Sequence, residues 1–110
     1  MKIKEVAEEL ELKAVVEGNL EKEVTGGHIG DLLSNVMSHA EAGDLWVTIQ
    51  GHQNVAAIAL LTEVAGVVVA EGLTIDEETI TKAEDKGINL YRSELSSYEL
   101  AGQLYELGIK

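Results

Sequence analysis

The segment from Gly66 to Ala70 constrains the fold more than any other part of the chain. It is apolar throughout and contains three consecutive valines. A short β-branched run without polar alternation is typical of a strand that is buried on both faces, as at the centre of a parallel sheet. Both faces of such a strand must be covered by further layers. The segment therefore predicts an α/β fold in which helices pack on a mainly parallel sheet.

Candidate strands and helices alternate along the chain and are joined by short connections, as in right-handed βαβ units. Strands are predicted at residues 12–16, 23–25, 44–50, 66–70 and 88–91. Helices are predicted at residues 3–10, 31–40, 55–64, 74–86 and 96–107. The second of them has Asp31 as its predicted N-cap, and its apolar face comprises Leu32, Leu33, Val36, Met37 and Ala40. We expect one three-layer domain over residues 1–110, with a sheet of about 4–5 short strands. Residues 1–22 form an N-terminal helix and strand, and residues 23–110 form the alternating core.

The charge of the chain is negative and unevenly distributed. The net charge is −12, and residues 23–81 contain nine acidic residues and all three histidines but no Lys or Arg. Such a surface repels nucleic-acid phosphates and anionic membranes, which excludes both as partners. Two explanations of the acidity remain, a solubilising surface and a basic protein partner. The segment also predicts a ligand-facing rim without a permanent cation.

Two further features indicate a soluble cytoplasmic protein. The apolar runs are much shorter than the ~20 residues of a membrane span, and the first residues lack the apolar stretch of a signal peptide. The chain contains no Cys, which excludes disulfides, thiolate metal sites and Cys nucleophiles.

Two loops are candidates for ligand binding. A glycine-rich segment at residues 25–31 is predicted between a strand and a helix, where backbone N–H groups can bind an anion. Its pattern matches neither the P-loop nor the dinucleotide-binding fingerprint, and a tightly packed turn or a subunit contact are the alternatives. The second loop follows the next predicted strand, and in a doubly wound sheet both loops would face one crevice. The candidate ligand-binding residues are Thr25, Gly26, Gly27, His28, Gly51, His52, Gln53 and Asn54.

Catalysis is not expected from this sequence. The spacings of His28, His39 and His52 match no compact metal motif, and no serine lies in a nucleophile-elbow pattern. We therefore predict no catalytic residues, no metal site and no cofactor. In the alternative that the chain is an enzyme, His28 or His52 would be the acid/base.

Two helices are candidates for self-association. The predicted helix at residues 55–64 is apolar nearly all round and slim, which permits close approach of a second subunit. Tyr98 and Tyr105 are seven residues apart on the last helix and fall on nearly the same face, where they either dock the helix or contact another subunit. The predicted homodimer interface therefore comprises Val55, Ile58, Ala59, Tyr98 and Tyr105.

An ordered series of motifs runs through residues 24–109. The motifs are Gly-Asp-Leu-Leu-Ser-Asn-Val-Met at 30–37, Gly-Asp-Leu-Trp-Val-Thr at 43–48, Asn-Val-Ala-Ala-Ile-Ala at 54–59, Ala-Gly-Val-Val-Val at 65–69 and Gly-Ile at 87–88. This series resembles the DRTGG domain family. The pentapeptide that names the family is absent, and the loops Thr25-Gly26-Gly27 and Gln50-Gly51-His52-Gln53 resemble that kind of segment.

The resemblance implies an α/β fold like that of the N-terminal domain of HPr kinase/phosphorylase. It also implies a regulatory setting, because such domains accompany CBS pairs in regulated pyrophosphatases and precede some phosphate acetyltransferases. We therefore expect a non-catalytic regulatory or adaptor domain that forms a homodimer and binds a protein partner or a small effector. The alternative is a small-molecule module that binds a nucleotide or metabolite at residues 26–30 and 51–54.

Overall fold

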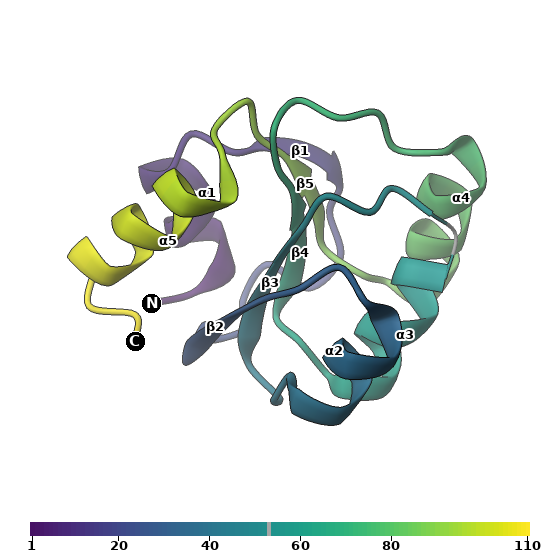
Figure 1. Ribbon diagram of the computed structural model, residues 1–110, viewed down its shortest axis with the longest axis horizontal. Helices are drawn as coiled ribbons and strands as arrows, with labels where there is room; N and C mark the ends of the chain where they lie inside the picture. Colours follow the sequence, from purple (N-terminus) through teal and green to yellow (C-terminus); the bar gives the residue numbers. More distant parts are fainter. Residues whose placement is uncertain (53) are drawn as a thin grey trace.

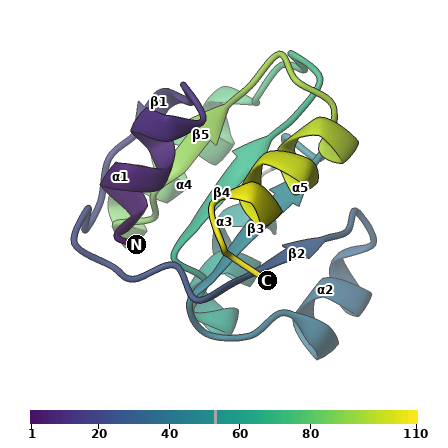
Figure 2. The ribbon, with the colours of Figure 1, turned by 90° about the vertical axis from the view of Figure 1, so that its left-hand side faces the viewer.

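A mostly parallel sheet lies between two layers of helices in the computed structural model, which describes residues 1–52 and 54–110 (Figure 1, Figure 2). Within these residues the five strands are β1 (Lys13–Val16), β2 (Gly26–Ile29), β3 (Asp44–Thr48), β4 (Gly66–Val69) and β5 (Leu90–Arg92). The five helices are α1 (Ile3–Glu9), α2 (Leu33–His39), α3 (Asn54–Thr62), α4 (Glu77–Lys86) and α5 (Ser97–Glu106). The predicted α/β fold is confirmed.

The strand order across the sheet is β1-β5-β4-β3-β2. Strands β2 to β5 are parallel and adjacent in chain order, and β1 adds to β5 in the antiparallel direction. The connecting helices α2, α3 and α4 all cover one face, while α1 and α5 cover the other (Figure 1). The parallel strands are therefore wound in one direction only. This order contains no reversal, so the crevice expected of a doubly wound sheet is absent between β2 and β5.

The valine-rich strand β4 is central, as the sequence predicts, and all four of its residues are buried. Its side chains alternate between two cores, because successive residues of a strand point to opposite faces. Val68 packs with α1 and α5, whereas Val67 and Val69 pack under α2, α3 and α4. Trp46 of β3 is fully buried in the second core, where its indole N–H donates to the Gly30 carbonyl at 2.9 Å.

Local sequence signals mark several helix ends correctly. Ser96 forms a capping box with Glu99 at the start of α5, and Gly87 ends α4 in the left-handed conformation at φ 67°. The prediction for α2 is wrong at its start, because Leu32 and not Asp31 is the N-cap residue. The predicted apolar face is confirmed in part, because Val36 is fully buried and Leu33 and Ala40 pack against the same core, whereas Leu32 and Met37 are exposed.

Ion pairs fasten the N-terminal helix to the segment before β2. Glu21 accepts from the ammonium groups of Lys2 at 2.8 Å and Lys4 at 2.9 Å, and Glu23 pairs with the N-terminal amine at 3.3 Å. Hydrogen bonds from Lys2 and Lys4 lower the pKa of the Glu21 carboxyl from its ordinary 4.5 to about 2.

The Glu21 cluster predicts a defined pH dependence. Because the pKa of Glu21 is lower in the folded chain, its ionised form stabilises the fold above about pH 4.5, and this contribution disappears as the pH falls towards 2. We expect Glu21→Gln to melt below the wild type at neutral pH and to converge with it in acid. Thermal unfolding followed by circular dichroism across this range checks the result. Glu106→Gln removes the same charge from α5 and should not show this pH-dependent difference.

Candidate functional site

The glycine-rich segment at residues 26–29 is the edge strand β2 and not a loop, which corrects the sequence-based interpretation. The strand begins at Gly26, opposite Asp44 of β3, rather than at residue 23. A Cβ at Gly26 would lie 2.8 Å from the Asp44 carboxylate, so the glycine is required for close packing. One row of backbone groups in this segment pairs with β3, and the extended conformation removes the geometry of an anion-binding loop.

The carboxyl ends of β2 and β3 are tied together by Asp31. One oxygen of its carboxylate accepts from the Thr48 hydroxyl and from the Ile49 backbone N–H, each at 2.9 Å. These bonds explain why Asp31 does not cap α2, since its side chain reaches sideways to the neighbouring strand.

The loop that follows β3 is held by hydrogen bonds with the start of α4. The Gly51 carbonyl accepts from the Asp76 N–H at 3.0 Å and from the Thr79 hydroxyl at 2.8 Å. A Cβ at Gly51 would also lie 3.0 Å from the Ile75 Cα. The candidate loops are therefore filled by contacts within the domain.

Replacing Asp31 by alanine should loosen this edge of the sheet. The Thr48 hydroxyl is buried and would lose its acceptor, which costs about 1–3 kcal/mol in free energy of unfolding. Chemical denaturation measures the loss, and hydrogen exchange should locate it at the Ile49 amide. Asp85→Ala removes an exposed carboxylate from α4 and should change stability by less than about 0.5 kcal/mol. Equal stability of the two variants would show that the Asp31 bonds contribute little.

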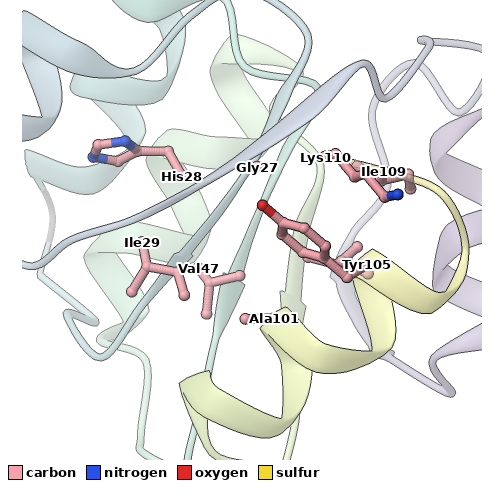
Figure 3. A pocket seen from close by; sticks show the side chains of 9 residues that line it. Gly27, His28, Ile29, Val47, Ala101, Tyr105, Ile109 and Lys110 are labelled. Carbon is pink, nitrogen blue, oxygen red and sulfur yellow. The ribbon is translucent and has the colours of Figure 1, made fainter.

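The three histidines lie apart. The His28 side chain points away from the α5 face (Figure 3), and its Nε2 is buried without a hydrogen-bond partner among the described residues. His52 Nδ1 accepts from the Asn54 N–H at 3.3 Å, and His39 Nδ1 lies 3.0 Å from the Asn35 carbonyl. Within residues 1–52 and 54–110 no group of three or more His, Asp or Glu side chains is arranged to hold a metal.

The structure does not unite the remaining candidate ligand-binding residues. Thr25 is exposed and donates its N–H to the Gly43 carbonyl, Gly27 lies in β2, and Asn54 begins α3. Gln53 lies outside the described residues. Of the described candidates, Gly27 and His28 line one groove between β2 and α5, and none of Gly51, His52 and Asn54 lines it. The ligand site expected to join the two loops therefore stays a prediction.

A shallow groove of about 130 Å³ runs between β2 and α5. Its floor is formed by Gly27 and Val47, and Tyr105 leans over it from α5 towards the strand (Figure 3). The groove is mainly apolar and opens onto Ile29, which is 48% exposed, and onto Tyr105, which is 62% exposed. The remaining lining residues are His28, Ala101, Leu104, Ile109 and Lys110.

The backbone edge beside this groove is free. β2 pairs with β3 alone among the described strands, so its outer row of N–H and C=O groups lacks a strand partner. Proteins protect such edges with lysine, proline or bulges. The opposite edge, β1, has both Lys13 and a register irregularity, whereas β2 consists of two glycines, a histidine and an isoleucine.

The predicted homodimer residues are divided between the two faces of the sheet. Val55 and Ala59 are each 1% exposed in the core beneath α3, so they present no surface to a partner. Ile58 is half-buried. Tyr98 and Tyr105 are exposed on α5, on the opposite face, and of the five only Tyr105 lines the groove. The two helices therefore do not form one continuous interface.

Some surface features escaped the sequence-based prediction. Arg92 of β5 reaches the carboxyl edge of the sheet, where its guanidinium donates to the Gly72 and Leu73 carbonyls. A permanent cation from outside residues 23–81 therefore lies at the carboxyl edge of the sheet, next to Gly72 and Leu73. The sequence predicts a turn at residues 26–30 and so does not identify Ile29 as a surface residue. The strand alternation of Gly27 and Ile29 is the signal that could identify it.

Comparison with known proteins identifies a related fold. No protein-family model and no curated protein matches the chain. The structure is similar to a chain that holds the CBS and DRTGG domains of the regulatory region of Clostridium perfringens pyrophosphatase, complexed with its activator diadenosine tetraphosphate. The TM-score is 0.77 at 15% sequence identity, over 94% of this chain and 45% of that chain.

This chain therefore spans less than half of the length of the pyrophosphatase chain. At 15% sequence identity, the similarity shows a shared fold and no more. None of the described helices combines the length and the apolar character of a membrane span. The chain has a DRTGG-like α/β fold of the kind found in the regulatory region of that pyrophosphatase.

Proposed function

We propose that this chain is a regulatory domain of the DRTGG type without catalytic activity, and that it acts as a homodimer joined through β2. The similar fold occurs in a regulatory region rather than a catalytic one, which supports the regulatory part. The observation that carries the dimer is the unprotected edge of β2 beside an apolar groove. Strand addition at a sheet edge gains affinity from backbone hydrogen bonds and specificity from pockets for alternate side chains.

A second copy fits this edge because β2 is complementary to itself. In an antiparallel pair centred on His28, Gly27 of one copy lies opposite Ile29 of the other. The missing side chain at Gly27 leaves room for that isoleucine beside Tyr105, and the twofold axis repeats the contact. Gly26 then faces Gly30, and Asp31 faces Thr25, so no like charges oppose each other in this register.

Apolar side chains on both faces extend the proposed interface beyond the strand. Ile29 and Tyr105 are exposed on the α5 side, and Leu32 and Met37 are exposed at α2, which lies beside β2 (Figure 2). A specific dimer usually buries about 800 Å² on each partner, which β2 alone does not provide. The flanking helices therefore belong to the proposed surface.

Sedimentation velocity over a range of concentrations tests the proposal. We expect a reversible dimer, with hydrogen exchange at residues 26–30 slowed as the concentration rises. A strict monomer at about 100 µM, well above micromolar dissociation constants, would contradict the dimer. A basic protein partner at the acidic surface is the second candidate occupant, and it would instead give a complex that weakens steeply with salt.

A further inference from the structure

Two cations meet at the carboxyl edge of the sheet although the chain is strongly acidic. Lys13 at the start of β1 lies directly opposite Arg92 at the end of β5 in the antiparallel pair. They are separated by 79 positions in the sequence, so only the pairing of these strands brings them together. Like charges directly opposite each other destabilise a sheet unless an anion compensates them.

No carboxylate of the described residues forms an ion pair with either cation. Acidic residues outnumber Lys and Arg by 20 to eight. Yet the ion pairs of the described residues all lie at the N-terminal cluster of Glu21 and Glu23, and none includes Lys13 or Arg92 within 4 Å. Both side chains can therefore form ion pairs with a bound anion.

Arg92 is held in a fixed orientation. Its Nε donates to the Leu73 carbonyl at 3.0 Å, and its Nη2 donates to the Gly72 carbonyl at 2.7 Å. These bonds take two of the five guanidinium N–H donors and leave three for another acceptor. The segment between β4 and α4 that supplies the carbonyls arches over this end of the sheet (Figure 1).

A hollow of about 350 Å³ lies beside the two cations. Thr74 lines it together with Lys13 and Arg92, and the rest of its lining is an apolar wall. Glu11 and Glu94 line an adjoining hollow that shares the same cations, so an anion is favoured on the Thr74 side. The apolar wall is formed by Ala14, Val15, Ile75 and Ile80.

We propose that Lys13 and Arg92 bind the phosphoryl group of a small metabolite in the hollow that they share with Thr74. A guanidinium, an ammonium and a hydroxyl supply charge-assisted hydrogen bonds to phosphate oxygens. The apolar wall packs against the organic part of the ligand. This site is separate from the loops at residues 26–30 and 51–54, and it does not depend on the proposed dimer.

An NMR titration of the ¹⁵N-labelled protein tests the site, with inorganic phosphate and phenyl phosphate as probes and sodium chloride at equal ionic strength as reference. We expect saturable amide shifts at residues 13–15, 74–75 and 92, with tighter binding of phenyl phosphate because of the apolar wall. Lys13→Gln should weaken binding about tenfold by removing one charged contact. Lys13 is exposed, so this variant should fold normally.

Lys86→Gln is the matched control, because it removes the same charge from the far end of α4 and should bind as the wild type does. Sodium chloride shifts equal to those of the phosphates would overturn the proposal. Unchanged phenyl phosphate binding by Lys13→Gln would overturn it too.

Discussion

Replacement of Ile29 by aspartate is expected to convert the proposed dimer to a monomer, with an increase of about a hundredfold or more in the dissociation constant. The substitution places one carboxylate per copy in the apolar groove beside Tyr105. Burying an unpaired charge and losing the isoleucine contact cost about 3 kcal/mol or more, and each 1.4 kcal/mol is a tenfold change. Sedimentation velocity measures the shift. The monomer should remain folded, because Ile29 is 48% exposed within one copy.

Leu61→Asp is the matched control for this variant. Leu61 is 68% exposed on α3, on the opposite face of the sheet from the groove, and its replacement should leave association unchanged. Equal effects of the two aspartates would contradict the assignment of the interface to β2.

Gly27→Val tests the proposed register more directly. A Cβ at Gly27 would have only ordinary contacts within one copy, at 3.7 Å from the Leu45 carbonyl oxygen and 3.8 Å from Leu104. The fold should therefore tolerate a side chain there, whereas the partner's Ile29 should not. A Gly27→Val protein that is stable and still dimeric would exclude the pairing of Gly27 with Ile29.

The largest loss of stability is expected from Asn89→Ala. Asn89 is 1% exposed, and its side-chain amide joins three segments of the chain. Its Oδ1 accepts from the Gly18 N–H at 2.7 Å, and its Nδ2 donates to the Asn19 carbonyl at 2.9 Å and to the Ala65 carbonyl at 3.0 Å. Truncation leaves these three backbone groups without their partner, the buried Ala65 carbonyl among them, and we expect a loss of about 3 kcal/mol.

Urea denaturation of Asn89→Ala measures this loss against Asn35→Ala. Asn35 is exposed on α2, so its replacement should change the free energy of unfolding by less than about 0.5 kcal/mol. A loss below about 1 kcal/mol in Asn89→Ala would show that water replaces the three hydrogen bonds.

The central strand and the helix ends were predictable because their signals are local. Three consecutive valines indicate burial on both faces wherever the strand lies. A capping box and a left-handed glycine act within one turn of a helix. Strand β2 was not predictable in the same way, since two glycines favour a turn in isolation and become a strand only through pairing with β3.

The candidate site residues show the same difference between local sequence signals and tertiary contacts. The apolar character of α3 is visible in the sequence, but the packing of α2 and α4 beside it decides that Val55 and Ala59 are buried and that Leu60 and Leu61 are exposed. Asp31 has the residue type of a helix cap, yet the nearness of Thr48 directs its carboxylate to β3. Both outcomes depend on neighbours that are distant in sequence.

Residue order alone therefore establishes the α/β class, the buried central strand and the acidic character of the chain. The tertiary structure decides which edge of the sheet is open, which side chains surround the groove, and that Lys13 lies opposite Arg92. The physical reason is that hydrophobic periodicity encodes how much of an element is buried, whereas strand order and register determine which residues meet.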